Sequence, residues 1–221
     1  MTPPLYRWPP AAKFDRTVPK AKFYEHGTIG PAIKAAMVSD VRRITWAYKL
    51  AESTINLPSS AEVPEIQVFE IDCKGEDVTE QVLAAIDRAV RTPIIFEIGR
   101  GVGADGAARM VAAHKQVDTG TPKLGPYFST DWRPVTDDRV PLPTAIDLTS
   151  MYTSLLEPLT PITSRPGEAL SDVIGRLTKA RALEREIAAL NRKLRNERQL
   201  NRKIELRRQL LDRQAALAAL V

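Results

Sequence analysis

The sequence predicts an α+β protein. Its body is a mainly antiparallel sheet with flanking helices, and a long basic helical segment follows, either one helix or a coiled-coil-like hairpin. All thirteen aromatic residues lie at or before Tyr152, so the packed core belongs to the first part of the chain. Strand-like and helix-like stretches follow one another there in the order ββαβββα. After residue 168 apolar residues recur at helical spacing, and no proline interrupts them.

Composition divides the 221 residues into four parts. Five prolines among the first twenty residues predict an extended arm. Three further prolines, Pro158, Pro161 and Pro166, indicate a linker between the body and the helical tail. The predicted parts are the arm 1–22, the body 23–157, the linker 158–167 and the tail 168–221.

Hydrophobic periodicity predicts the elements of the body. The run VRRITWAYKL alternates apolar and polar residues and EIQVFEIDC is largely apolar, so both are strands, close enough along the chain to pair as antiparallel neighbours. Asp77 with Glu80 resembles a helix start. The residues 107–114 fit either a helix or a strand. In chain order the other predicted elements are helix 31–38, strand 41–50, strand 65–73, helix 77–89, strand 93–98, strand 127–132 and helix 145–156.

The glycines Gly101, Gly103 and Gly106 have the spacing of a dinucleotide-binding turn and follow a predicted strand. That turn also requires a helix to open at once, with its N-terminus toward the pyrophosphate. A flexible hairpin loop fits the same residues and is the favoured interpretation, so no cofactor is predicted.

The tail carries the basic surplus of the protein. Residues 168–221 contain thirteen Lys/Arg against seven Asp/Glu, a net charge of +6, and the rest of the chain contains nineteen against twenty, a net charge of −1. Glu197 and Asn201 interrupt the apolar stripe, which leaves open a hairpin turning near residues 194–201 or a continuous helix whose polar residues pair across an interface. The basic charges fit either a solvated helix face or contacts with phosphate. The expected partner interface is Leu183, Ile187, Leu190, Leu194, Leu200, Ile204 and Leu211. The expected nucleic-acid contacts are Arg192, Lys193, Arg195, Arg198, Arg202 and Lys203.

An alternative site lies near the end of the second strand. Asp72 and Lys74 share one side of that strand, and Glu65 is a further carboxylate. A metal-dependent nuclease of the carboxylate–lysine type uses acidic groups to hold a divalent cation and a lysine to activate water. Charged residues at strand ends are also ordinary, so catalysis remains the alternative.

The sequence contains no recognisable pattern for a reactive thiol, a zinc site or a membrane-spanning segment. Cys73 is the sole cysteine and lies in an apolar run, which favours a buried, inert thiol. The two histidines, His26 and His114, lie far apart, and no zinc-ligand spacing exists. The sequence has no apolar run of membrane-spanning length and no signal-peptide pattern at its start, so we expect a cytoplasmic protein that binds no metal and no membrane.

Several stretches together resemble a bacterial domain-of-unknown-function family, number forty-three ninety-one. The most specific are ITWAYKLAESTINL and ERQLNRKIEL, and the similarity spans nearly the whole chain in the right order. The resemblance implies a neighbour of superfamily-2 helicase and DNA methyltransferase genes, in clusters like restriction or phage-defence islands. It implies no catalytic residue.

The expected function is therefore a non-catalytic interaction subunit of such a DNA defence system. Its tail would dock on a helicase or methyltransferase and possibly on DNA. Two alternatives stay open, namely the nuclease with Asp72 and Lys74, and a homodimeric DNA-binding protein joined through the tail. The sequence sets no oligomeric state.

Overall fold

The structure, a computed structural model, describes residues 5–26, 29–101, 103–116, 122–160 and 170–220. It divides into two compact units, Met1–Pro161 and Ile162–Val221. Each unit has its own architecture and is described by itself. Among the described residues no helix is long and apolar enough to cross a membrane.

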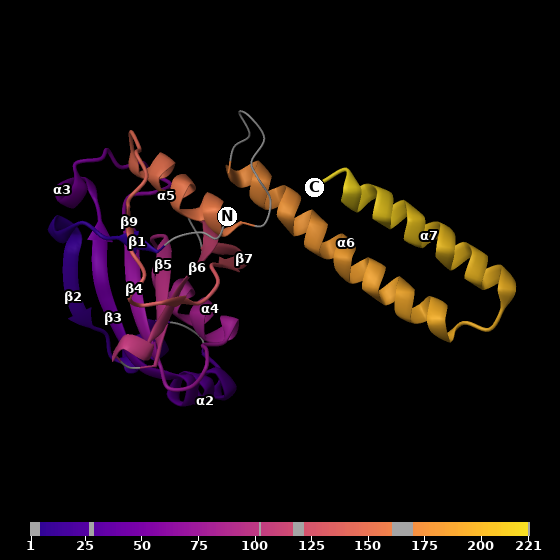
Figure 1. Ribbon diagram of the computed structural model, residues 1–221, viewed down its shortest axis with the longest axis horizontal. Coiled ribbons are helices and arrows are strands. Elements are labelled where there is room, and N and C mark those ends of the chain that lie inside the picture. The colour runs from indigo at the N-terminus through magenta and orange to yellow at the C-terminus, as the bar shows by residue number, and fades with distance from the viewer. Residues whose placement is uncertain (1–4, 27–28, 102, 117–121, 161–169, 221) are drawn as a thin grey trace. The chain divides into compact units, whose positions relative to one another are not determined.

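The first unit is built on a seven-stranded sheet (Figure 1). The strand order is β2-β3-β4-β5-β6-β7, and the short β8 also pairs with β6. All neighbours are antiparallel except β4 and β5, which a crossover through α4 connects. The predicted fold class, with its mainly antiparallel sheet, is confirmed. The strands are β2 (Lys13–Thr17), β3 (Val41–Leu50), β4 (Ile66–Cys73), β5 (Ile94–Arg100), β6 (Ala107–Gln116), β7 (Lys123–Ser129) and β8 (Arg133–Pro134).

Short elements and helices complete this unit. The arm that the prolines predict contains regular structure. Its first strand, β1, pairs in parallel with β9 in a separate two-stranded sheet, and β2 forms an edge of the main sheet. These elements are β1 (Tyr6–Arg7), a 3₁₀ turn (Pro10–Ala12), α1 (Lys20–His26), α2 (Pro31–Asp40), α3 (Glu52–Ile55), α4 (Glu80–Ala89), a 3₁₀ turn (Gly103–Asp105), β9 (Val140–Pro141), α5 (Leu148–Leu156) and a 3₁₀ turn (Glu157–Leu159).

Two predicted helix starts shift for identifiable reasons. The helix expected from residue 77 begins at Glu80, because the Asp77 carboxylate instead accepts the Val78 N–H and pairs with Arg109. The helix expected from residue 145 begins at Leu148, because Asp147 is its N-cap and accepts the Ser150 N–H at 2.7 Å. The ambiguous residues 107–114 belong to strand β6.

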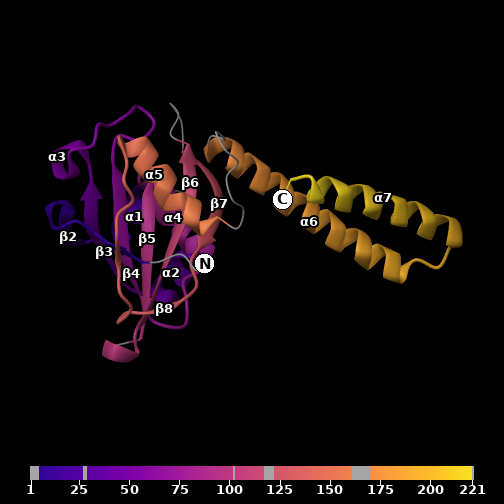
Figure 2. The same ribbon diagram turned by 45° about the horizontal axis from the view of Figure 1, so that its top comes forward.

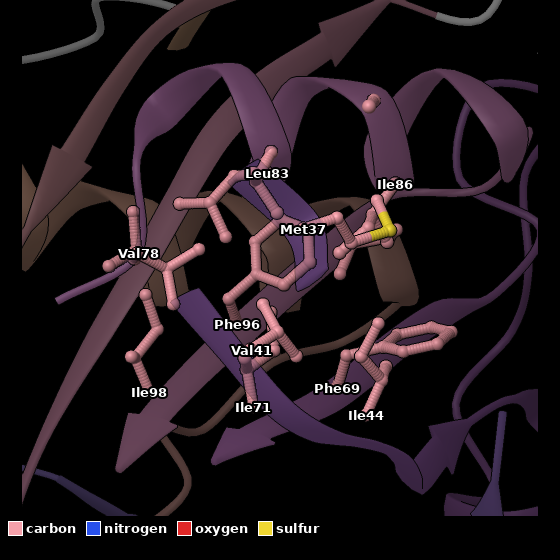
Figure 3. Packing of buried hydrophobic residues seen from close by; sticks show 14 of the residues in the cluster. Met37, Val41, Ile44, Phe69, Ile71, Val78, Leu83, Ile86, Phe96 and Ile98 are labelled. Carbon is pink, nitrogen blue, oxygen red and sulfur yellow. The ribbon is translucent and has the colours of Figure 1, made fainter. Parts of the chain in front are cut away.

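One hydrophobic core cluster lies between one face of the sheet and the helices α1, α2 and α4. Alternate residues of β4 and β5, such as Phe69, Ile71 and Phe96, point toward this side. Helix residues Met37 and Leu83 meet them, and all five are at most 3% exposed (Figure 3). By the strand period of two, Glu70, Asp72 and Glu97 point to the opposite face of the sheet.

A buried lysine ties α4 to the sheet. Lys115 on β6 is fully buried, and its Nζ lies 2.5 Å from Asp87 Oδ1. The same ammonium donates to the backbone carbonyls of Asp87, Val90 and Thr92, each at 2.8 Å, and so satisfies carbonyls in the last turn of α4 and in the residues that follow it. Tyr127 donates its hydroxyl to the second Asp87 oxygen at 2.7 Å.

The second unit is a helical hairpin. Its helices are α6 (Leu170–Asn196) and α7 (Leu200–Ala218). Both views show them side by side and running in opposite directions (Figures 1 and 2). Of the arrangements that the sequence leaves open for the tail, the structure has the hairpin, with its turn within residues 194–201.

Candidate interaction surface on the helical hairpin

Glu197, one of the two polar residues that interrupt the apolar stripe, lies in the turn of the hairpin, and the other, Asn201, lies in the first turn of α7. The Glu197 carboxylate accepts the backbone N–H groups of Arg198 and Gln199 at 2.8 and 2.9 Å. These hydrogen bonds favour the ionised form and lower the pKa of Glu197. Arg202 Nε lies 3.6 Å from the same carboxylate. The turn therefore uses Glu197 as an internal acceptor.

The inner seam of the hairpin differs from the stripe that the sequence predicts for the second arm. On α7 the half-buried leucines are Leu206, Leu210 and Leu217, at spacings of four and seven. Arg213 follows the same stripe and pairs with Glu186 of α6 at 2.7 Å. The stripe through Leu206, Leu210 and Leu217 has more leucines than the stripe through Ile204 and Leu211. The antiparallel pairing with α6 therefore buries the leucine-rich stripe in preference.

The expected partner residues on α6 lie along one stripe. Leu183, Ile187, Leu190 and Leu194 are all half-buried. Leu190 borders a groove between the two helices, together with Gln209 and Arg213 of α7. At the open end of the hairpin, Arg176 donates to the Leu220 carbonyl at 2.8 Å.

The expected partner residues on α7 face outward. Ile204 is 58% exposed and Leu211 is 65% exposed. Ala215 and Ala218, also exposed, extend the line at spacings of four and three. At 100° per residue this line points roughly 130° away from Leu206, Leu210 and Leu217. We call Ile204, Leu211, Ala215 and Ala218 the outer stripe. The side chain of Leu200 lies outside the described residues.

The expected nucleic-acid contacts gather at the closed end of the hairpin. Arg192, Lys193 and Arg195 belong to the last turns of α6, and Arg202 and Lys203 to the first turn of α7. Arg198 lies in the turn between them. Arg192, Lys193 and Arg202 line one groove between the helices, beside Asn196. We call the six residues Arg192, Lys193, Arg195, Arg198, Arg202 and Lys203 the basic tip.

The alternative nuclease residues have other partners. Asp72 accepts two bonds from the Arg43 guanidinium, both at 2.9 Å, and Lys74 donates to the Val38 carbonyl at 2.7 Å. Glu65 pairs with Lys49 at 2.6 Å. Glu65 and Asp72 lie at opposite ends of one strand, roughly 23 Å apart at 3.3 Å per residue. In the part of the chain that the structure describes, no group of three acidic, histidine or cysteine side chains could hold a metal ion.

The remaining candidates are structural. Cys73 is buried, and burial raises the pKa of its thiol to about 11. His114 stacks against Tyr152 with ring centroids 6.2 Å apart, and burial lowers its pKa. The side chain of His26 lies outside the described residues. The glycine-rich stretch connects the antiparallel strands β5 and β6, as a hairpin loop does, with Gly101 at φ +76°.

Sequence reasoning did not find a polar cluster on the second face of the sheet. Glu97 of β5 accepts a bond from Trp8 Nε1 at 3.1 Å and is held by the guanidinium of Arg139. Arg139 also donates to the Tyr6 carbonyl at 3.0 Å, so the cluster fastens the first strand to the body. Glu70 lies beside Glu97 in the register of β4 and β5. The sequence does contain a signal for this cluster, because Glu97 is a glutamate within the otherwise apolar run PIIFEI.

Comparison with known proteins identifies the family of the chain. Residues 7–217 match the family model described as "Domain of unknown function (DUF4391)". No curated protein and no solved structure matches the chain.

Proposed function

The chain belongs to the DUF4391 family, and from this premise we propose that it is a non-catalytic interaction subunit whose helical hairpin docks on a larger DNA-acting enzyme. The outer stripe of α7 carries the proposal. Ile204 and Leu211 are exposed on a helix whose other face is already packed, so they are available to a partner.

Charge along the outer stripe favours a different protein over a second copy of this chain. Arg208 lies between Ile204 and Leu211 in the line. A parallel second copy would set Arg208 against Arg208. An antiparallel copy would bring Arg207 near Arg207 and Asp212 near Glu205. A parallel copy also brings Arg207 near Asp212, but it keeps the two Arg208 side chains together on the apolar seam. We therefore propose that the occupant is a partner helix with an apolar stripe and a carboxylate opposite Arg208.

The identity of the partner follows from the family resemblance. We propose a superfamily-2 helicase or a DNA methyltransferase of a bacterial defence system, which places both proteins in the cytoplasm. The surroundings of Asp72 and Lys74 support an interaction role over the nuclease alternative. Asp72 is held by Arg43, and Lys74 donates to a backbone carbonyl.

The test compares two variants of the tagged full chain in its native host. In one, Ile204 and Leu211 are both changed to Asp. In the control, Ile146 of the body, which is 82% exposed, is changed to Asp. Full burial of one such side chain contributes about 1.5–3 kcal/mol, so the double change is expected to weaken binding by at least a hundredfold.

The proposal requires that a helicase or DNA methyltransferase co-purifies with wild type and with I146D, and is lost from I204D/L211D. Circular dichroism must show equal helicity for the three proteins. The proposal fails if the partner stays bound to I204D/L211D, or if no DNA-acting enzyme co-purifies. A concentration-dependent dimer of wild type that I204D/L211D abolishes would instead establish the homodimer.

A further inference from the structure

The second interaction surface of the hairpin is the basic tip. The turn brings together cations that are up to eleven positions apart along the chain. From residue 192 to residue 208 the sequence has eight Lys/Arg and two Asp/Glu, a net charge of +6. This equals the net charge of the whole tail, so the closed end of the hairpin carries its positive potential.

The acidic residue within the turn is already engaged. Both backbone N–H bonds at the turn go to Glu197 Oε1, and Arg202 lies near its other oxygen. Among the residues that the structure describes, Arg192, Arg195 and Arg198 form no side-chain ion pair, and all three are exposed. Their charge is therefore available to an external anion.

The composition of the tip indicates the chemistry of that anion. Three carboxamides, Asn196, Gln199 and Asn201, stand among the six cations, and the aromatic and β-branched residues of a protein-binding patch are missing from residues 192–203. Protein interfaces centre on apolar and aromatic side chains, whereas nucleic-acid interfaces are more polar and strongly cationic. Arginine guanidinium groups and carboxamides are common donors to phosphate oxygens.

We propose that the basic tip binds the phosphodiester backbone of a nucleic acid without reading its sequence. Arg192, Lys193 and Arg202 line one groove between the helices, so both arms contribute to a single site. The outer stripe uses other residues, so this proposal stands or fails separately from docking on a protein.

The test is fluorescence anisotropy with labelled duplex DNA of random sequence, over a range of salt concentrations. Each neutralised phosphate contributes about −0.9 to the slope of log K against log salt, so six contacts predict a slope of about −5. Changing Arg192, Arg195 and Arg198 to Gln is expected to reduce the slope by about 2.7. Parallel titrations with single-stranded DNA and duplex RNA identify which nucleic acid binds best.

The matched control removes three charges from the body through K34Q, R91Q and K123Q, all at exposed positions. This control is expected to keep the wild-type slope. The proposal is overturned if the body control loses as much affinity as the tip variant, or if the tip variant binds within twofold of wild type. Absence of binding at low salt, or equal competition by polyglutamate of the same charge, would also overturn it.

Discussion

Leu83 of the body and Leu211 of the hairpin are the same residue type on amphipathic helices, but Leu83 is 0% exposed and Leu211 is 65% exposed. Charged groups differ in the same way. Lys115 is enclosed by a carboxylate and three carbonyls, whereas Arg192 of the tip is exposed. At these two positions the body satisfies its apolar and charged groups internally. The hairpin leaves both kinds of group on its surface, which is the property of a binding element.

The largest effect is expected from breaking the buried pair of Lys115 and Asp87 in the body. Lys115→Met leaves Asp87 buried with Tyr127 as its remaining side-chain donor and removes three hydrogen bonds to carbonyls. Breaking a buried pair from one side costs about 3–5 kcal/mol, and we expect this loss in urea unfolding. Lys34→Met, on the exposed surface of α2, is the control and should change stability by less than about 0.5 kcal/mol. Equal effects of the two changes would show that the body does not depend on this pair.

The second largest effect is expected from truncating Leu83, and the same truncation of Leu211 gives a direct comparison. Leu83→Ala is expected to lower the free energy of unfolding of the body by about 2–5 kcal/mol, because it opens a cavity between α4 and the sheet. Leu211→Ala removes the same atoms from a mostly exposed position and should cost less than about 0.5 kcal/mol. Urea unfolding of the full chain, followed by tryptophan fluorescence for the body and by circular dichroism for the helices, measures both. A large loss at Leu211 would mean that the outer stripe is already packed in the free protein.

The contrast between local pattern and long-range contact explains which features of the body the sequence could predict. Strands β3, β4 and β5 are apolar runs whose burial depends on local pattern, so their positions and the sheet class follow from periodicity. The pairing of Trp8 with Glu97, or of Lys115 with Asp87, joins residues 89 and 28 positions apart. No local pattern encodes such a contact, because it depends on strand order.

The hairpin shows a different limit of prediction from sequence. The basic tip could be predicted as a set of residues, because charge is a property of composition, and the turn then brought its members together. The face of α7 that meets α6 could not be assigned from the stripe through Ile204 and Leu211 alone. A count of both stripes, with Leu206, Leu210 and Leu217 on the other, would have favoured the one that is half-buried.

The smallest effect concerns Glu70, a half-buried carboxylate of the body that lies beside Glu97. Burial first, and then the neighbouring Glu97, raise the pKa of Glu70 above its ordinary value. A raised carboxyl pKa means that the folded state binds the proton more tightly than the unfolded state does. The contribution of Glu70 to stability therefore falls as pH rises through the interval from the unfolded pKa, about 4.3, to the folded pKa.

Glu70→Gln removes this unfavourable charge and should stabilise the protein at pH 7, by less than about 1 kcal/mol because the group is only half-buried and partly screened. The difference from wild type is expected to shrink as pH falls toward 4, where Glu70 is mostly protonated in both states. Urea unfolding of the two proteins between pH 4 and pH 8 measures this difference. Destabilisation by the change at pH 7 would show that Arg139 compensates Glu70 as well as Glu97, and that the body leaves no carboxylate of this cluster unsatisfied.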